Sequence, residues 1–298
     1  MDPGRRRLLI GGSAIAVVGV AGGFGLVEHG VLPGKGHLDV WLGDCGSEAA
    51  VPTANPGPMV AGSFRSAARK GVEVGWTAAY PPGSTASAAL PVCVLLHARG
   101  GTHRWPFDRL GLQHHLAAAV DAGAVRPFVL VSVDGGKATN WHPRANGDDP
   151  QAMVTDELLP MLARRGLQTS GIGVWGWSLG GYGALLLAEH LGPTRLRTVA
   201  AASPAIWTSY GDAQSGTFDG AADFGRNDVL AQASKLAGIP VRVDTGSDDP
   251  FAGTTRRLMA AVHPTPAGGV SSGCHDPAFW SRHAAAELAF VGSHLPPP

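Results

Sequence analysis

The sequence predicts an α/β domain, in which helices cover both faces of a mostly parallel central sheet. Several segments are continuous apolar runs, as expected of strands that are buried on both faces. These runs alternate with helical patterns over most of the chain, which is typical of a parallel sheet. The chain has 298 residues, of which 44% are hydrophobic, so a large core can form. Lys plus Arg and Asp plus Glu both number 23, so the charge gives no sign of a nucleic-acid partner.

The elements can be assigned in chain order from these patterns. We expect strands at 72–80, 90–98, 127–136, 171–178, 197–205 and 239–247. We expect helices at 107–123, 149–166 with a kink at Pro160, 179–192, 227–238, about 250–262 and about 277–291.

The N-terminal segment differs from the rest of the chain. Arg5, Arg6 and Arg7 precede an uncharged run from Leu8 to Val27, which is the pattern of an export signal. Consecutive arginines followed by two leucines resemble a twin-arginine signal. A run of about 20 residues is also long enough to span a bilayer. A cleaved signal and a retained anchor at 8–27 therefore both stay open, and we expect membrane contact only through this segment.

The three cysteines set limits on metal and disulfide chemistry. Cys93 lies in the apolar run LPVCVLL and is expected to be a small buried side chain. Cys45 and Cys274 could pair in an oxidising compartment. No spacing of Cys and His resembles a zinc site, so we expect no metal and no cofactor.

Two serines, Ser178 and Ser271, fit the pattern G-x-S-x-G. Ser178 follows the apolar run IGVW and precedes the helical pattern LGGYGALLLAEH, which is the strand–turn–helix context of a nucleophile elbow. Gly176 and Gly180 lack side chains where the strand and the helix crowd together. Ser271 has no buried strand before it and no helix after it. We therefore predict that Ser178 is the nucleophile.

A nucleophilic serine needs a base and a carboxylate that orients the base. Asp248 and Asp249 follow the strand at 239–247, and His275 lies in a loop before the last helix. This gives the chain order serine, acid, histidine that the strand–turn–helix arrangement requires. An Asp before a Pro is also a common helix cap, and position along the sheet does not separate Asp248 from Asp249.

Three motifs, VWGWSLGGYGALLLAEH, VDTGSDDPF and GCHDPAFW, together resemble the esterase D family of α/β hydrolases. That family includes S-formylglutathione hydrolases, acyl-carbohydrate esterases and mycolyltransferases. The resemblance covers most of residues 72–292 and implies an α/β-hydrolase fold. The family pattern D-x-G-x-x-D-x-F implies that Asp249 is the catalytic acid. Residues 206–226 lie where this fold often inserts a lid, but they are too short to form a large cap domain.

Acyl transfer also needs two N–H donors for the oxyanion. One should be Leu179, directly after the nucleophile. The other should come from the loop His97-Ala98-Arg99-Gly100-Gly101, which resembles the family's H-G-x-G-G loop and implies Arg99 as the donor. Ala98 stands where the family has glycine.

Substrate contacts are expected from residues near the same sheet edge. Asn140 and Trp141 follow the strand at 127–136, and Trp177 lies beside the nucleophile. Trp141 could wall an acyl or sugar pocket, or it could equally be a core aromatic.

These observations predict an exported serine esterase. The substrate is expected to be a small-molecule, lipid or carbohydrate ester, and the site of action the cell envelope or the extracellular space. The alternatives are an acyltransferase that moves an acyl group to a sugar hydroxyl, and a non-catalytic binding protein on a hydrolase fold. We divide the chain into an export signal or anchor at 1–30, a Gly/Pro-rich linker and entry segment at 31–70, and a catalytic domain at 71–294.

Overall fold

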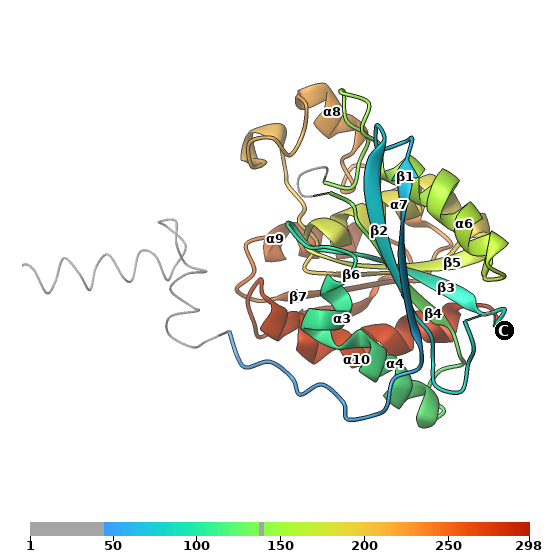
Figure 1. The fold of residues 1–298 in the computed structure, drawn as a ribbon. Coiled ribbons are helices and arrows are strands. Elements are labelled where there is room, and N and C mark those ends of the chain that lie inside the picture. Colours follow the sequence, from blue (N-terminus) through green and yellow to red (C-terminus); the bar gives the residue numbers. More distant parts are fainter. Residues whose placement is uncertain (1–44, 87, 137–139) are drawn as a thin grey trace, which may run out of the picture.

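Eight strands form one sheet in the residues that the computed structural model describes, which are 45–86, 88–136 and 140–298 (Figure 1). The strand order is β1-β2-β4-β3-β5-β6-β7-β8. The pairs β1–β2 and β2–β4 are antiparallel, and the remaining pairs are parallel, so the predicted mostly parallel sheet is confirmed. The strands are β1 (Met59–Ser66), β2 (Val72–Ala79), β3 (Pro91–Leu96), β4 (Val129–Val133), β5 (Gln168–Trp177), β6 (Leu196–Ala202), β7 (Val241–Gly246) and β8 (Ala267–Ser271).

Helices cover both faces of the sheet and divide the core into two clusters of buried side chains (Figure 1). Alternate residues of β5 point to opposite faces, as the pleat requires: Val174 belongs to one cluster and Trp175 to the other. One face carries α3 (Trp105–Leu110), α4 (Leu112–Asp121) and α10 (Pro277–His294), and the other carries α6 (Leu159–Arg164), α7 (Leu179–Arg195) and α9 (Ala252–Ala261). The shorter elements are α5 (Pro150–Ala152), η1 (Met153–Leu158), η2 (Tyr210–Asp212), α8 (Ala221–Arg226) and η3 (Ala233–Leu236).

Three expected helices differ from the prediction. The helix at 107–123 is divided at Gly111, whose φ of 63° is outside the helical region. In the segment at 149–166, η1 is a π-helix that precedes Pro160. Pro160 has no N–H for an α-helical bond, and its ring would clash with the carbonyl four residues earlier, which the wider turn avoids. The segment at 227–238 forms a single turn capped by the Asp228 carboxylate, followed by the 3₁₀ turn η3, so the helix predicted there is wrong.

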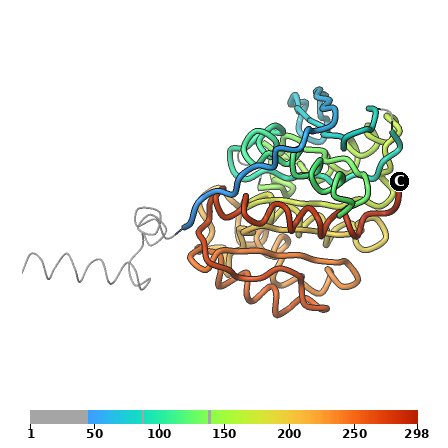
Figure 2. Tube along the Cα trace, turned by 90° about the horizontal axis from the view of Figure 1, so that it is seen from below, coloured from blue at the N-terminus to red at the C-terminus, as the bar shows by residue number. Residues whose placement is uncertain are grey.

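The first described residues pack beside α10 before the chain crosses to β1 (Figure 2). Cys45 forms a disulfide bond with Cys274, and Cys93 is a buried free thiol. Asp276 lies close to the two paired sulfurs, but cysteines joined in a disulfide offer no thiolate to a metal.

No helix in the described part of the chain is both long enough and apolar enough to cross a membrane. The predicted signal or anchor at 1–30 lies outside the described residues, as does the linker up to residue 44.

Candidate active site

Ser178 occupies the turn between β5 and α7. Its backbone has φ 54° and ψ −116°, a conformation that residues with a side chain rarely adopt. The Ser178 N–H donates to the Ala202 carbonyl at 2.9 Å, and its carbonyl accepts from the Tyr182 N–H at 3.0 Å. The strained turn is therefore held by the neighbouring strand and by the first turn of the helix.

The two glycines that flank this serine lie where backbones approach closely. A Cβ atom on Gly176 would be 2.1 Å from the Gly180 carbonyl oxygen. A Cβ atom on Gly180 would be 1.9 Å from the Leu96 carbonyl oxygen. Both distances are far below van der Waals contact, so any larger residue would force the strand and helix apart.

The structure brings Ser178, His275 and Asp249 together in one chain of hydrogen bonds. His275 Nε2 lies 2.8 Å from Ser178 Oγ, and His275 Nδ1 lies 2.8 Å from Asp249 Oδ2. Because a carboxylate only accepts, Nδ1 carries the proton and Nε2 is free to accept one from the serine. The Asp249 side chain is fully buried, whereas 23% of the His275 side chain is exposed.

The two adjacent aspartates have different partners. The second carboxylate oxygen of Asp249 accepts from the Phe251 N–H at 2.8 Å, which fixes the carboxylate plane toward His275. Asp248 is half-buried and accepts a hydrogen bond from the Ser247 hydroxyl at 2.8 Å. The geometry therefore pairs Asp249 with the histidine, as the family pattern implied.

Leu179 and Arg99 line the same pocket as Ser178. Leu179 is the first residue of the 17-residue helix α7, where backbone N–H groups have no acceptor within the helix and the helix dipole favours negative charge. Arg99 lies in the loop that follows β3. This arrangement suits two N–H donors for an oxyanion.

A buried histidine shapes the loop that carries Arg99. His97 Nε2 accepts from the Gly135 N–H at 3.0 Å, so its Nδ1 is protonated and donates to the Ala98 carbonyl at 2.8 Å. Burial lowers the pKa of His97 below its ordinary value, which keeps the ring neutral at pH 7. The Trp141 indole N–H donates to the His97 carbonyl at 3.1 Å. These bonds fix the start of the loop, a role that the sequence analysis did not assign to either residue.

The pocket beside Ser178 has a volume of about 330 Å³ and mainly apolar walls, which include the rings of Trp207, Phe251 and Trp280. The ring centroids of Phe251 and Trp280 lie 5.4 and 5.5 Å from that of His275. The residues around the pocket are Ala98, Arg99, Ser178, Leu179, Ala205, Trp207, Gln214, Phe251, His275 and Trp280. A concave apolar site with a few convergent polar groups is typical of a small-molecule site.

Within the described part of the chain, none of the three predicted substrate contacts lines this pocket. Trp177 is fully buried on the α10 side of the sheet, because it precedes Ser178 on a strand whose side chains alternate. Asn140 is buried and donates to the Thr217 carbonyl at 2.8 Å. Trp141 packs against Gly135 and Gly183, where added Cβ atoms would each lie 2.3 Å from its side chain. The expectation that these three residues contact the substrate is therefore corrected: their side chains are buried and pack within the fold.

The sequence analysis missed the aromatic walls of the pocket. Phe251 and Trp280 lie within the motifs DTGSDDPF and CHDPAFW, so proximity to the acid and the base was an available signal. Trp207 comes from the polar segment at 206–226, which has no comparable signal.

Ser271 also lies near a histidine and an aspartate. Its Oγ is 3.1 Å from His283 Nε2, and His283 Nδ1 is 3.4 Å from Asp244 Oδ1. However, Arg242 holds both carboxylate oxygens of Asp244, at 2.6 and 3.1 Å. As expected, no buried strand precedes Ser271: β8, which was not predicted, is an edge strand in which no residue is buried. Ser271 lies at the end of that strand and is not among the residues that line the Ser178 pocket.

A serine on a strand–turn–helix at the edge of a mostly parallel sheet, hydrogen-bonded to a histidine, defines an α/β hydrolase. Residues 71–266 match the model of the Esterase family, described as "Putative esterase", and the chain belongs to that family. The protein is thus a carboxylic ester hydrolase, and the resemblance to esterase D-like enzymes is confirmed.

Several solved structures are similar in fold. A ferulic acid esterase matches with a TM-score of 0.69 and 18% identity, over 80% of this chain and 98% of that one. An S-formylglutathione hydrolase from Agrobacterium tumefaciens matches with a TM-score of 0.66 and 19% identity, over 84% and 99%. The enzyme of the same name from Staphylococcus aureus has a TM-score of 0.62 and 13% identity, over 79% and 100%. The search of curated proteins found no match.

Proposed function

We propose that the protein is an exported serine esterase, in which Ser178 is the nucleophile, His275 the base and Asp249 the orienting acid. The observation that carries this proposal is the continuous chain of hydrogen bonds from Ser178 through His275 to Asp249, each 2.8 Å long, at the wall of an open pocket.

The reaction follows from this geometry. His275 Nε2 takes the proton of Ser178 as Oγ attacks the ester carbonyl, and the developing imidazolium is stabilised by Asp249. The N–H groups of Leu179 and Arg99 stabilise the oxyanion, and removal of one such donor costs about 10²–10³ in kcat in a serine protease. His275 then protonates the leaving alcohol, which leaves an acyl-enzyme. Water, activated by His275, releases the acid and restores Ser178.

The pocket favours an apolar group on the substrate. Trp207, Phe251 and Trp280 offer ring faces and edges, and a volume of about 330 Å³ accommodates a short acyl chain or one ring. A longer lipid or a carbohydrate would extend from the pocket mouth into solvent.

Export is supported by two independent features. The leader has a basic start and an apolar run from Leu8 to Val27. The disulfide between Cys45 and Cys274 is of a kind that persists in oxidising compartments and is rare in the cytosol.

Product analysis of the purified protein tests the proposal. We would incubate it with p-nitrophenyl acetate and butyrate, with and without glucose, and identify the products by mass spectrometry. Free acid as the main product supports an esterase, whereas acyl-glucose formed in preference to acid would indicate an acyltransferase. Ser178→Ala should abolish both products, and Ser271→Ala should leave them unchanged. A folded protein that forms neither product would indicate a binding protein.

A further inference from the structure

We propose that the Cys45–Cys274 disulfide, together with the residues that follow Cys45, positions His275 for catalysis. We call residues 45–49 the strap. The inference rests on the proposed function, because it assigns the strap a role in the same reaction.

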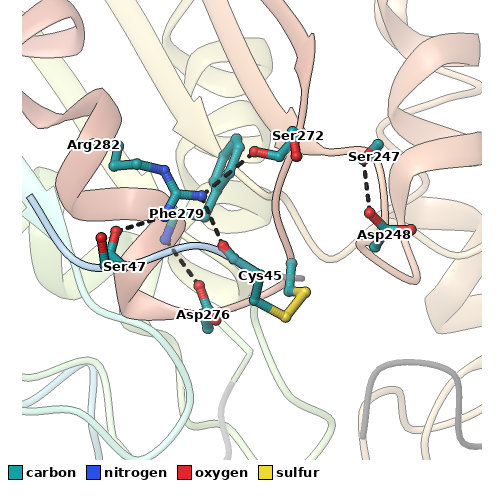
Figure 3. The surroundings of a disulfide bond; sticks show 9 residues. Cys45, Ser47, Ser247, Asp248, Ser272, Asp276, Phe279 and Arg282 are labelled. Atoms are coloured by element: carbon teal, nitrogen blue, oxygen red, sulfur yellow. Dashed lines mark hydrogen bonds between the residues drawn. A yellow bond between two sulfur atoms is a disulfide. The ribbon is translucent and has the colours of Figure 1, made fainter. Parts of the chain in front are cut away.

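The disulfide joins the strap to the residue directly before the base. Cys274 directly precedes His275 in the chain, and its disulfide partner Cys45 lies 229 residues away. Figure 3 shows the disulfide bond at Cys45 and its surroundings. Both cysteines are buried, with 5% and 3% of their surfaces exposed. Any movement of the Cys274 backbone is passed through one peptide bond to His275, so the disulfide limits where the imidazole can lie.

The strap is itself held on the helices that surround the base. Arg282 of α10 donates to the Ser47 carbonyl at 2.8 Å and to the Cys45 carbonyl at 3.0 Å (Figure 3). The Ala49 N–H donates to the Ser281 hydroxyl at 2.9 Å. Glu48 forms an ion pair with Arg109 of α3. The strap is therefore held in place by contacts with two helices, and these contacts limit how far the disulfide can move.

The loop that carries the base has little stiffness of its own. It reads SSGCHDP, and Gly273 has a φ of 148°, which favours glycine. On its other side the loop meets the turn that carries the acid, where the Asp248 N–H donates to the Gly273 carbonyl at 3.0 Å. A Cβ atom on Gly246 would lie only 2.1 Å from that carbonyl oxygen. The loop is thus fixed between the acid turn and the disulfide, and loss of the disulfide frees one side.

The consequence should appear in turnover rather than in substrate binding. A misplacement of about 1 Å in a catalytic group can cost about 10²-fold in rate. The loop keeps its contact with the acid turn, so we expect a smaller loss, about tenfold in kcat. KM should change little, because Trp207 and Phe251 lie on other segments of the chain.

The test uses Cys45→Ala, Cys274→Ala and the double variant, with Cys93→Ala as the control that removes a buried cysteine without a disulfide. Hydrolysis of p-nitrophenyl acetate gives kcat and KM, and labelling to completion with a fluorophosphonate counts the active sites. All three disulfide variants should lose the same factor in kcat per labelled site, because each removes the same bond. Cys93→Ala should keep the wild-type kcat.

A different result would assign the disulfide to stability alone. In that case the thermal midpoint or the labelled fraction would fall while kcat per labelled site stayed at the wild-type value. If the cysteine variants do not fold, Ser281→Ala decides, since it removes the hydrogen bond from the Ala49 N–H and keeps the disulfide, whereas Arg282 also donates to Ser272 in the loop of the base. A lower kcat per labelled site supports the proposal, and an unchanged kcat overturns it. Ser178→Ala separates the two hypotheses: an active Ser178→Ala variant contradicts the proposed function, whereas an inactive one, together with an unchanged kcat per labelled site in the cysteine variants, contradicts only the role of the strap.

Discussion

Ser178 and Ser271 both lie within hydrogen-bond distance of a histidine that is close to an aspartate. What separates them is the surrounding backbone. Ser178 has a strained φ of 54° at the start of a long helix, whereas Ser271 ends an exposed edge strand. The three side chains of a triad are therefore insufficient by themselves, and the turn, the helix N-terminus and the pocket complete the site.

The choice between Asp248 and Asp249 can be tested directly. Asp249→Asn should lower kcat by about 10⁴, because an amide favours the wrong tautomer of His275. Asp248→Asn should have a far smaller effect, since it changes a half-buried group that contacts Ser247. The measurement is kcat for each variant on one activated ester, with folding checked by circular dichroism. A severe loss in Asp248→Asn with near-normal Asp249→Asn would transfer the role to Asp248.

A substitution of Trp141 tests whether a residue that does not line the pocket contributes to catalysis. Trp141→Phe keeps an aromatic ring and removes the hydrogen bond to the His97 carbonyl. A neutral hydrogen bond is worth about 1 kcal/mol, so we expect kcat to fall by about fivefold as the loop of Arg99 loosens. KM should stay constant in steady-state kinetics. A rise in KM at constant kcat would restore the original expectation that Trp141 contacts the substrate.

Among the strands and helices, the sequence predicted those that local patterns determine. Each of the six predicted strands forms, and β3 and β4 are predominantly apolar runs because they are buried on both faces. β8 escaped prediction because it is short, glycine-containing and unburied. The helix expected at 227–238 is only a capped turn followed by a 3₁₀ turn, and hydrophobic periodicity does not distinguish such short turns from a continuous helix.

The candidate site, like the helices and strands, was predicted only where local sequence patterns determine it. Ser178 and His275 were predicted because each lies at a fixed place relative to a strand or helix, and Asp249 was preferred to Asp248 because it fits the family pattern D-x-G-x-x-D-x-F. The pocket walls were not found, since Trp207, Phe251 and Trp280 come from three segments that only tertiary packing brings together. Trp177 was misassigned because adjacency in sequence places a strand residue on the opposite face of the sheet.

The segment that carries Trp207 is anchored by an ion pair, and this gives a pH prediction. Asp219 pairs with Arg144 at 2.7 Å, and the bond to Arg144 lowers the pKa of Asp219 from 3.8 to about 2. A carboxyl group whose pKa is lower in the folded state stabilises the protein at pH values above its pKa in the unfolded chain. This stabilisation is lost as the pH falls toward the pKa of the folded state. The wild type should therefore have a higher Tm than Asp219→Asn from pH 7 down to about 4.

The difference between these two proteins should shrink between pH 4 and pH 2, as Asp219 becomes protonated. Thermal melts in a series of buffers measure it. Asp108→Asn serves as the control, because its pair with Arg104 is exposed and such pairs contribute little. A Tm difference that does not change with pH would show that the side-chain amide, and not the charge, accounts for the effect.

At the scale of the whole molecule, the disulfide connects the two ends of the described chain. Cys45 lies at its start and Cys274 close to the last helix, so the bond closes around nearly the whole sheet. The strap also lies within the segment at 31–70 that is predicted to link the leader to the fold. Because His275 directly follows Cys274, the proposed role of the strap makes the compartment of folding relevant to activity.

The route of export is the remaining prediction. A reporter protein fused after residues 1–35 should leave the cytoplasm, because a basic start followed by an apolar run is recognised by export machinery. Changing Arg5→Lys and Arg6→Lys together preserves the positive charge and removes the consecutive arginines. The double change should block export if the twin-arginine route is used, since that route reads the arginine pair and not the charge alone.

Fractionation of cells into cytoplasm, membrane and medium measures the outcome, and the unaltered leader is the control. Export that survives the double change would indicate the general secretory route. Reporter that stays in the membrane fraction would identify residues 8–27 as a retained anchor, whereas release into the medium would identify a cleaved signal.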